Sequence, residues 1–243
     1  MRAGLFLSLL LCAFGAAAQS SDSATVVVPV VGSVFGATMV HWQTDLELIN
    51  DTGRETDVAL ELTGADAPPI IVSMAPGQVQ RFPNVVTDAF DTDNVLSPLR
   101  ITTGGRRSVT VRAAVYAVRG AEVSPLEPIA VYAPQSWFPI RVLDDLAFSE
   151  QFRTNIGLLN YGTREAVFTL ALQRLPGRNL AVTTIVVGPN ALFHMSIQSI
   201  FPLITEGEHF SVVVECAAPE TYVYGSVIES AHHAGRFVVP RIR

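Results

Sequence analysis

Apolar and polar residues alternate in two segments of the chain. In residues 42–48 the even-numbered positions are apolar or β-branched and the odd-numbered positions are polar, and residues 152–158 repeat the pattern with one glycine at an odd position. Alternation with a period of two is typical of a strand that buries one face and exposes the other. An α-helix would place its apolar residues three and four positions apart, so the pattern predicts a strand in each segment.

The two segments belong to an internal repeat. Residues 42–62 and 152–172 align without a gap at an offset of 110 positions. The identical pairs are Thr44/Thr154, Leu48/Leu158, Asn50/Asn160, Arg54/Arg164, Glu55/Glu165, Leu60/Leu170 and Leu62/Leu172. A repeat of this period indicates one structural unit that is used twice.

Turn residues follow each of these predicted strands. Residues 50–53 read Asn-Asp-Thr-Gly and residues 160–163 read Asn-Tyr-Gly-Thr. Asparagine bonds readily to its own backbone and glycine tolerates a positive φ, so both tetrapeptides favour a tight turn. Apolar residues alternate again in 58–62 and 168–172, and we therefore expect a β-hairpin in each copy.

The same register extends over the rest of the chain. Pro29 and Pro139 also lie 110 positions apart, and a proline inside the first strand suits a sheet edge or a bulge. The further strands that the pattern predicts are 25–31, 70–74, 79–82, 99–103, 108–119 and 129–132 in the first copy, and 137–142, 184–187, 191–195, 210–216, 221–230 and 236–239 in the second. Residues 84–91 and 197–204 are less regular, and each predicts one short helical turn.

Short strands separated by turn signals every 8 to 12 residues or so, with no long helical pattern, predict an all-β fold. We expect two tandem antiparallel immunoglobulin-like β-sandwich domains, residues 25–133 and 136–243. A second hairpin is expected near the end of each domain, one turning at Gly104-Gly105 and the other at residues 217–220.

The first residues have the features of a processing signal. Arg2 supplies a positive charge, residues 5–14 are apolar, and residues 16–18 are alanines that fit a cleavage site. We therefore expect a signal peptide over residues 1–18 and a mature chain exported to the periplasm, the cell surface or the medium. No later stretch reaches the roughly 18 uninterrupted apolar residues of a transmembrane helix, so no transmembrane span is expected.

Composition narrows the classes of partner. The formal net charge is −6, and all 16 basic residues are arginine. Nucleic-acid binding needs a basic stripe, which argues against a nucleic-acid partner. Without the leader, Cys216 is the only cysteine, so no intramolecular disulfide is expected; it follows three valines in an apolar strand and is interpreted as a small core residue.

The sequence offers few candidates for metal binding. His232 and His233 are adjacent in a predicted turn, and a loop can bring two adjacent histidines together on a metal ion. No cysteine or carboxylate lies at a supporting spacing. An oxygen-rich cluster is formed by Asp88, Asp91, Asp93 and Asn94. Calcium favours such ligands, yet the spacing fits no calcium loop and the second copy lacks the cluster, so an ordinary turn is the preferred interpretation. No metal or cofactor is assigned.

Two tyrosines are candidates for a binding surface. In the predicted strand 221–230, Val223, Gly225 and Val227 are expected to face the core, which leaves Tyr222 and Tyr224 on the outer face. Exposed aromatic residues on a rigid sheet suit a sugar or a protein partner. The alternative, which we favour, is that the two rings pack under a loop or against the neighbouring unit, because the chain is 49% hydrophobic and much outer surface must be covered.

Several of these patterns are shared with a recognisable group of proteins. The block W-x-T-D-h-x-h-x-N (h, apolar), a later P-G turn and the closing Y-G-S-V-I-E-S…F-V-V-P resemble secreted, largely uncharacterised bacterial proteins that are built from tandem units of about this size. The resemblance covers essentially the whole mature chain. It implies export and immunoglobulin-like modules, and it implies no reaction. The second copy departs from the block, with Phe152 and Asn155 in place of Trp42 and Asp45.

A weaker resemblance is to the two-domain periplasmic pilus chaperones, which also carry two immunoglobulin-like domains behind a signal peptide. Those proteins anchor a client's C-terminal carboxylate with an arginine and a lysine, and this chain has no lysine.

No catalytic motif is present: there is no H-E-x-x-H, G-x-S-x-G, phosphate-binding glycine loop or C-x-x-C. The leading hypothesis is therefore an exported, non-enzymatic β-sandwich protein that acts in surface adhesion, in assembly or as an accessory binding module with a protein or cell-surface glycan partner. The alternatives are a chaperone-like assembly factor, and a glycan- or metal-binding module that uses the two tyrosines or the two adjacent histidines.

Overall fold

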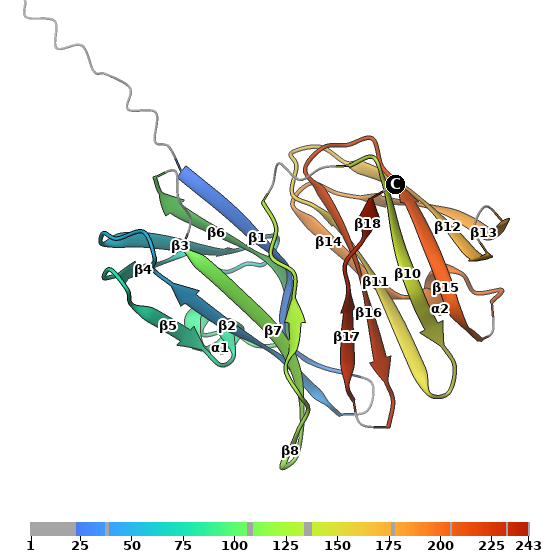
Figure 1. Ribbon diagram of the computed structural model, residues 1–243, viewed down its shortest axis with the longest axis horizontal. Helices are drawn as coiled ribbons and strands as arrows, with labels where there is room; N and C mark the ends of the chain where they lie inside the picture. Colours follow the sequence, from blue (N-terminus) through green and yellow to red (C-terminus); the bar gives the residue numbers. More distant parts are fainter. Residues whose placement is uncertain are drawn as a thin grey trace, which may run out of the picture.

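The computed structural model describes residues 23–36, 39–105, 109–133, 138–175, 178–204, 206–231 and 233–242. The predicted signal peptide, residues 1–18, lies outside these ranges. Apart from two short helices the regular structure is β-strand, and all strand pairs in the sheets are antiparallel, which confirms the all-β prediction (Figure 1). No helix in the described ranges has the length and apolar character needed to cross a membrane.

The N-terminal half, residues 23–133, forms one nine-stranded sheet. Its path runs β4-β3-β6-β1-β2-β7-β8, with β5 paired to β2 and β9 paired to β7. The elements are β1 (Ser23–Phe35), β2 (His41–Ile49), β3 (Thr56–Leu62), β4 (Ile70–Met74), β5 (Val79–Phe82), α1 (Val85–Phe90), β6 (Val95–Gly104), β7 (Thr110–Arg119), β8 (Glu122–Val123) and β9 (Glu127–Ile129).

This sheet folds over on itself around one core. Leu46 and Leu48 of β2 and Leu60 of β3 have no solvent-exposed surface and belong to the same buried cluster, although their strands do not pair. The sheet can fold over at strand β1, because the pairing of β1 with β6 shifts register between Val28 and Val31. Pro29 lies in this irregularity, as the prediction of an edge or a bulge requires.

The C-terminal half, residues 138–242, contains two separate sheets. Their strand orders are β13-β12-β15-β10-β18 and β14-β11-β16-β17. The elements are β10 (Ile140–Phe148), β11 (Phe152–Asn160), β12 (Ala166–Leu175), β13 (Arg178–Val187), β14 (Ala191–Ser196), α2 (Ile197–Ile200), β15 (Gly207–Glu215), β16 (Thr221–Glu229), β17 (Gly235–Val238) and β18 (Arg241–Ile242). Both sheets contribute to one core, which includes Leu170 and Val212 from the first sheet and Leu158 and Val223 from the second. Cys216 is buried in this core and is not in a disulfide.

The two halves use the same pairing scheme. The order β4-β3-β6-β1 corresponds to β13-β12-β15-β10, and β5-β2-β7-β9 corresponds to β14-β11-β16-β17. The register corresponds as well: Asp45 lies opposite Ala114 in the first half, and Asn155 lies opposite Ser226 in the second.

The predicted hairpins are wrong. Strands β2 and β3 belong to opposite layers, since β2 pairs with β1, β5 and β7 whereas β3 pairs with β4 and β6. Strands β11 and β12 lie in different sheets, and so do β15 and β16, while β6 does not pair with β7. Each connection crosses the core because both flanking strands have an apolar face, and these faces bury more surface against one another across the core than side by side.

The repeated asparagine holds each β2–β3 and β11–β12 connection in place. The Asn50 side-chain amide donates to three backbone carbonyl groups, those of Arg54 (2.8 Å), Met74 (2.9 Å) and Ala75 (3.1 Å). The Asn160 amide donates to the corresponding groups of Arg164 (2.7 Å), Val187 (3.0 Å) and Gly188 (2.9 Å). The identical pair in the sequence thus marks the same corner of each half.

Candidate functional site

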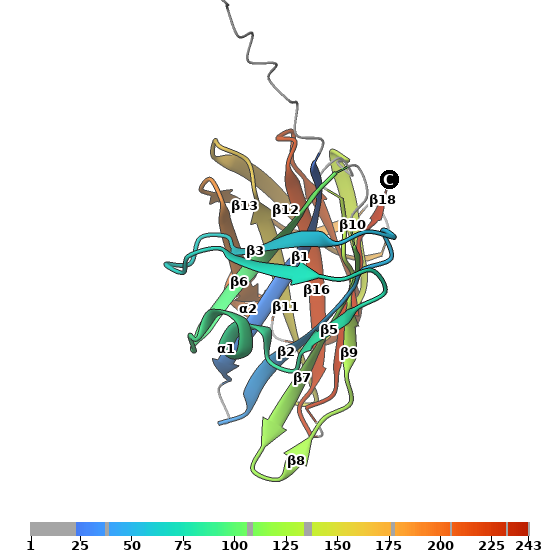
Figure 2. The same cartoon turned by 90° about the vertical axis from the view of Figure 1, so that its left-hand side faces the viewer.

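One face of the C-terminal half is covered by the N-terminal half. Figure 1 shows the sheet β14-β11-β16-β17 on the side of the C-terminal half that faces the N-terminal half, and Figure 2 shows β11 and β16 behind β1. A third buried cluster joins the two halves here, with Val27 and Tyr132 from the first and Leu159, Tyr222 and Tyr224 from the second.

The predicted binding tyrosines lie inside this junction. Tyr222 is 7% exposed and Tyr224 is 0% exposed, so an exposed aromatic ladder is wrong. The Tyr222 ring stacks on Tyr132 of the other half, with centroids 3.9 Å apart. The rings are buried because the neighbouring half covers the apolar outer surface of this sheet, as the preferred interpretation of the sequence expected. Burial also raises the pKa of Tyr222 to about 12.

Tyr224 lies across a glycine. A Cβ atom built on Gly157 would come within 2.0 Å of the Tyr224 ring, so only glycine leaves room for it. The ring reaches over the sheet to His194, where the Tyr224 hydroxyl and His194 Nδ1 are hydrogen-bonded at 2.8 Å. Burial, with the positive charge of Arg153 as a smaller contribution, lowers the pKa of His194 to about 4, so the imidazole is neutral at pH 7.

The corresponding face of the N-terminal half is polar. Glu47 occupies the position of Gly157, and it forms an ion pair with Arg112 at 2.9 Å. Asp45 occupies the position of Asn155 and pairs with Arg81. The outward residues are therefore charged in the copy whose sheet faces solvent, and they are uncharged at the same positions in the copy whose sheet is covered.

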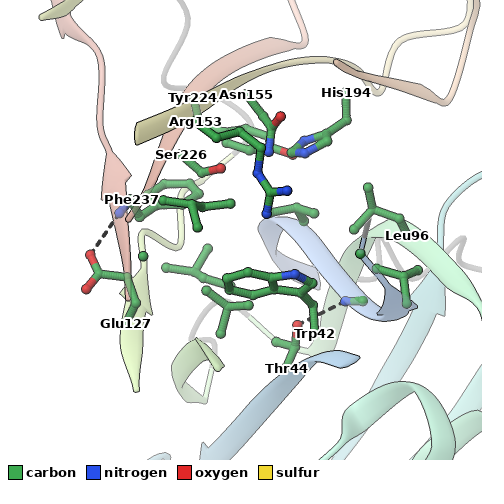
Figure 3. Close-up of a pocket in the computed structure, with 18 of the residues that line it drawn as sticks. Trp42, Thr44, Leu96, Glu127, Arg153, Asn155, His194, Tyr224, Ser226 and Phe237 are labelled. Carbon is green, nitrogen blue, oxygen red and sulfur yellow. Dashed lines mark hydrogen bonds between the residues drawn. The ribbon is translucent and has the colours of Figure 1, made fainter. Parts of the chain in front are cut away.

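A cavity of about 300 Å³ lies between the two halves beside these rings, and we call it the junction cavity. Figure 3 shows Trp42 from β2 on one side of it, with Tyr224 and His194 from the C-terminal half opposite. Most of its wall is apolar and comes from both halves, including Val34, Leu96, Ile129, Ile228 and Phe237.

Arg153 is the polar group that projects into the junction cavity. Figure 3 shows its guanidinium group pointing from β11 toward Trp42. Its Nε atom is buried and has no hydrogen-bond partner, and no ion pair to it occurs among the residues that the structure describes. The side chain as a whole is partly exposed, so a ligand can reach its guanidinium group, which has no acidic partner and is suited to receive an anion.

The other charged groups at the cavity already have partners. One carboxylate oxygen of Glu127 accepts a hydrogen bond from the Phe237 backbone N–H at 2.8 Å, a contact that also links the two halves. The Arg236 guanidinium is paired with Asp145 at 3.1 Å. The arrangement therefore combines apolar walls for burial with one guanidinium group for polar recognition.

The adjacent histidines do not form a visible site. His232 lies outside the described residues, and His233 has a φ of 53° and a buried Nε2 atom without a hydrogen-bond partner. In the described part of the chain no group of three or more histidine, cysteine or acidic side chains is placed to hold a metal ion.

The acidic cluster near α1 is dispersed. Asp88 accepts a hydrogen bond from the Asn84 backbone N–H at 2.8 Å, next to the start of the helix. Asp93 instead accepts one from Ser33 and lies 3.6 Å from His41 Nε2. Asp91 and Asn94 adopt positive φ angles of 49° and 56°, which agrees with the preferred interpretation as a turn.

Of the residues that line the junction cavity, Tyr224 was a candidate from the sequence and the others were missed. Alternation places Trp42 on the buried face of its strand and assigns no role to Arg153 or His194. The sequence did contain one signal of a covered face. The outward position that holds Glu47 in the first copy holds Gly157 in the second.

The chain was compared with protein families, with curated proteins and with solved structures, and none of these comparisons finds a match.

Proposed function

We propose that the protein is an exported, non-enzymatic binding module that holds a small, largely apolar ligand in the junction cavity. The observation that carries this proposal is the cavity itself. Its volume of about 300 Å³ lies at the lower end of the range of small-molecule sites, and its apolar wall with a few convergent polar groups is the usual composition of such sites. Its position between two packed halves is also a preferred location for ligands.

The immunoglobulin-like assignment is part of the proposal. The pairings of β1 with β6, and of β2 with β7 and then β9, follow the B–E and C–F–G order of immunoglobulin sheets. The matching scheme in the second half supports two tandem domains of this type. Together with the sequence blocks quoted above, it supports a relationship to secreted bacterial proteins built from tandem units.

Export rests on the leader-like residues 1–18. Fusion of residues 1–25 to alkaline phosphatase lacking its own leader tests it in a bacterial host, because that enzyme becomes active only outside the cytoplasm. We expect phosphatase activity and a mature N-terminus at Gln19. An inactive, uncleaved cytoplasmic fusion would contradict export.

A neutral fluorescent probe tests ligand binding. N-phenyl-1-naphthylamine becomes brightly fluorescent in apolar sites and carries no charge, so its binding depends on the cavity and not on Arg153. We expect saturable binding to the wild-type protein. Ser226→Phe fills the cavity from β16, because Ser226 lines it, and should weaken binding at least about tenfold, which corresponds to about 1.4 kcal/mol.

The chain provides a matched control for that variant. Ala114 occupies the position of Ser226 in the first half and does not line the junction cavity, so Ala114→Phe should leave probe binding unchanged. Equal binding by both variants, or no saturable binding by the wild type, would refute the proposed site.

A second candidate function, strand-mediated assembly, is favoured by one specific observation. Within the described part of the chain strand β13 pairs only with β12, and Leu180, Val182 and Val186 on its outward face are 43%, 56% and 56% exposed. No charged residue interrupts the strand after Arg178. Natural sheets protect such edges with charges or prolines, so an unprotected edge is a surface to which another strand can add.

A labelled synthetic peptide of residues 178–187 tests this second function. Its sequence is that of β13, so it can extend the sheet as an added strand. We expect Val182→Lys to abolish peptide binding, whereas Ser73→Lys on the shorter edge strand β4 should not affect it. Undetectable binding to the wild-type protein would remove the assembly function and leave the ligand-binding function untouched.

A further inference from the structure

We infer that the ligand of the junction cavity is a small organic carboxylate, with its carboxylate on the Arg153 guanidinium and its apolar body against Trp42. This inference rests on the proposed function, since it names the class of ligand for that same cavity. The inference requires the ligand to be negatively charged, which the shape of the cavity alone does not.

The contacts of Arg153 point to an anionic ligand. The Arg153 Nε atom is buried without a partner, and the guanidinium group points into the cavity. His194, which faces the cavity from β14, is neutral at pH 7 and supplies no negative charge. Glu127 is on the opposite wall beside Phe237 and makes no ion pair with Arg153. The positive charge is therefore left for a ligand to neutralise.

The first half shows that this charge is not a requirement of the fold. Gln43 holds the position of Arg153 in the first copy, and its side chain accepts a hydrogen bond from the Tyr116 hydroxyl at 2.7 Å. The same sheet thus forms with a neutral residue at this place. The second copy instead has an arginine on the cavity wall, and among the described residues it has no acidic partner, so its guanidinium group is free to bind an anionic ligand.

The geometry favours a carboxylate among the organic anions. A guanidinium group presents parallel N–H donors that match the two oxygens of a carboxylate. The cavity offers one such group and otherwise apolar surface, with Asn155 and Ser226 as neighbouring neutral polar groups. A dianion such as a phosphate monoester would need further positive charge, and the second guanidinium at the cavity, that of Arg236, is occupied by Asp145.

Calorimetric titration with one naphthalene series tests the inference. The probes are 2-naphthylacetate, its neutral amide 2-naphthylacetamide, and 2-naphthyl phosphate. We expect the carboxylate to bind the wild-type protein roughly ten- to a hundredfold more tightly than the amide, in line with the strength of a hydrogen-bonded charge pair.

The Arg153→Gln variant introduces the residue of the first copy and should remove this preference, because it weakens binding of the carboxylate at least about tenfold more than binding of the amide. Arg119→Gln makes the same charge change at the exposed end of β7, and it should keep the preference. Thermal unfolding of both variants establishes that they are folded.

The outcomes separate this inference from the proposed function. Binding of N-phenyl-1-naphthylamine with equal affinities for the carboxylate and the amide would overturn the inference and leave the ligand-binding function standing. A preference that survives in Arg153→Gln, or tighter binding of the phosphate than of the carboxylate, would also overturn it. If none of the compounds binds, both proposals fail.

Discussion

At the scale of single residues, the conserved chemistry between the two copies lies in the corners of the fold. Asn50 and Asn160 each donate to three backbone carbonyl groups and accept from the backbone two residues further on. Both are almost completely buried. The side-chain amide of asparagine has two N–H donors and one oxygen acceptor, and each of these is hydrogen-bonded here. This requirement explains why the residue is identical in the two copies while most outward residues differ.

Replacing this asparagine should destabilise the protein strongly. Asn160→Ala leaves the carbonyl groups of Arg164, Val187 and Gly188 without their donor in a buried corner. We expect a loss of about 2–4 kcal/mol in the free energy of unfolding, measured by urea denaturation. The half-buried Gln80 makes one long hydrogen bond of 3.5 Å, so Gln80→Ala is a suitable control with a small effect. Similar losses in the two variants would contradict the role assigned to Asn160.

Gly157 should be intolerant of any side chain. The Cβ atom of Gly157→Ala would collide with the Tyr224 ring, which would have to leave its place beside His194. We expect a destabilisation of about 1–3 kcal/mol, the usual cost of overpacking. Gly188→Ala meets no atom within 4 Å and should be tolerated. In the background of Tyr224→Leu the cost of Gly157→Ala should shrink, so additive effects in this double-mutant cycle would argue against the contact.

His194 should make stability depend on pH. Its pKa is about 4 in the folded protein and 6.5 in an unperturbed chain, so between these values the unfolded state binds more protons than the folded state. Stability is therefore fully present above pH 6.5 and is lost as the pH falls toward 4, by about 3 kcal/mol from this group. Urea denaturation at a series of pH values measures the loss. In His194→Gln the decrease over this window should be smaller by that amount, and an unchanged pH profile would contradict the burial of a neutral imidazole.

Sequence reasoning found the strand faces of individual residues but not their surroundings. Val223 and Val227 face the core as predicted, and Tyr222 and Tyr224 lie on the other face. Alternation reports which side of a strand a residue occupies. It does not report what covers that side, which is why the tyrosines were considered for an exposed surface and Arg153 was overlooked.

At the scale of elements, most strands and both helical turns lie where the pattern predicts them. β4 and β5 have the predicted bounds, and α1 falls inside the irregular stretch 84–91. The strand predicted over 137–142 instead extends over Ile140–Phe148, and β13 begins earlier than predicted. Pairing was predicted less well: every expected hairpin is a connection across the core. Local turn chemistry is similar in both kinds of connection, so only the three-dimensional fold distinguishes them.

Strand β13 provides a prediction at this scale. Because it pairs only with β12, alternate backbone N–H groups of Arg178–Val187 are hydrogen-bonded and the others point to the open edge. Amide hydrogen exchange followed by NMR should show alternately slow and fast residues along β13, with slow exchange at every residue of Thr169–Gln173 in β12, which pairs on both sides there. Uniformly slow exchange in β13 would mean that this edge is covered in solution.

At the scale of the whole molecule, the two copies differ in the surface that they present. In the first half the β5-β2-β7-β9 part of the sheet carries the ion pairs Arg81–Asp45 and Arg112–Glu47. The corresponding sheet of the second half carries rings that are buried under the first half. Contacts such as the Tyr132–Tyr222 stack and the Glu127–Phe237 hydrogen bond join the halves. The junction cavity follows from this asymmetry, because its walls come from both copies.

The sequence indicated the repeat and favoured burial of Tyr222 and Tyr224 under a loop or the neighbouring unit, but it did not identify the residues that cover them. The relation between the halves depends on contacts between residues far apart in the chain, such as Tyr132 with Tyr222, and a local pattern shows the face of each residue but not its partner. Comparison of the outward positions of the two copies carries part of this information, because a face that changes from ion pairs to glycine and tyrosine has changed its surroundings.

The most direct test of a ligand site between the halves is the NMR signal of the Trp42 indole N–H. Trp137→Phe removes the second tryptophan, and the remaining indole signal is followed during titration with 2-naphthylacetate. We expect a saturable shift of this signal together with that of the Arg153 Nε–H group, and no shift in the Ser226→Phe variant. Saturable binding that leaves both signals unchanged, or an equal shift in Ser226→Phe, would contradict a ligand site between the halves.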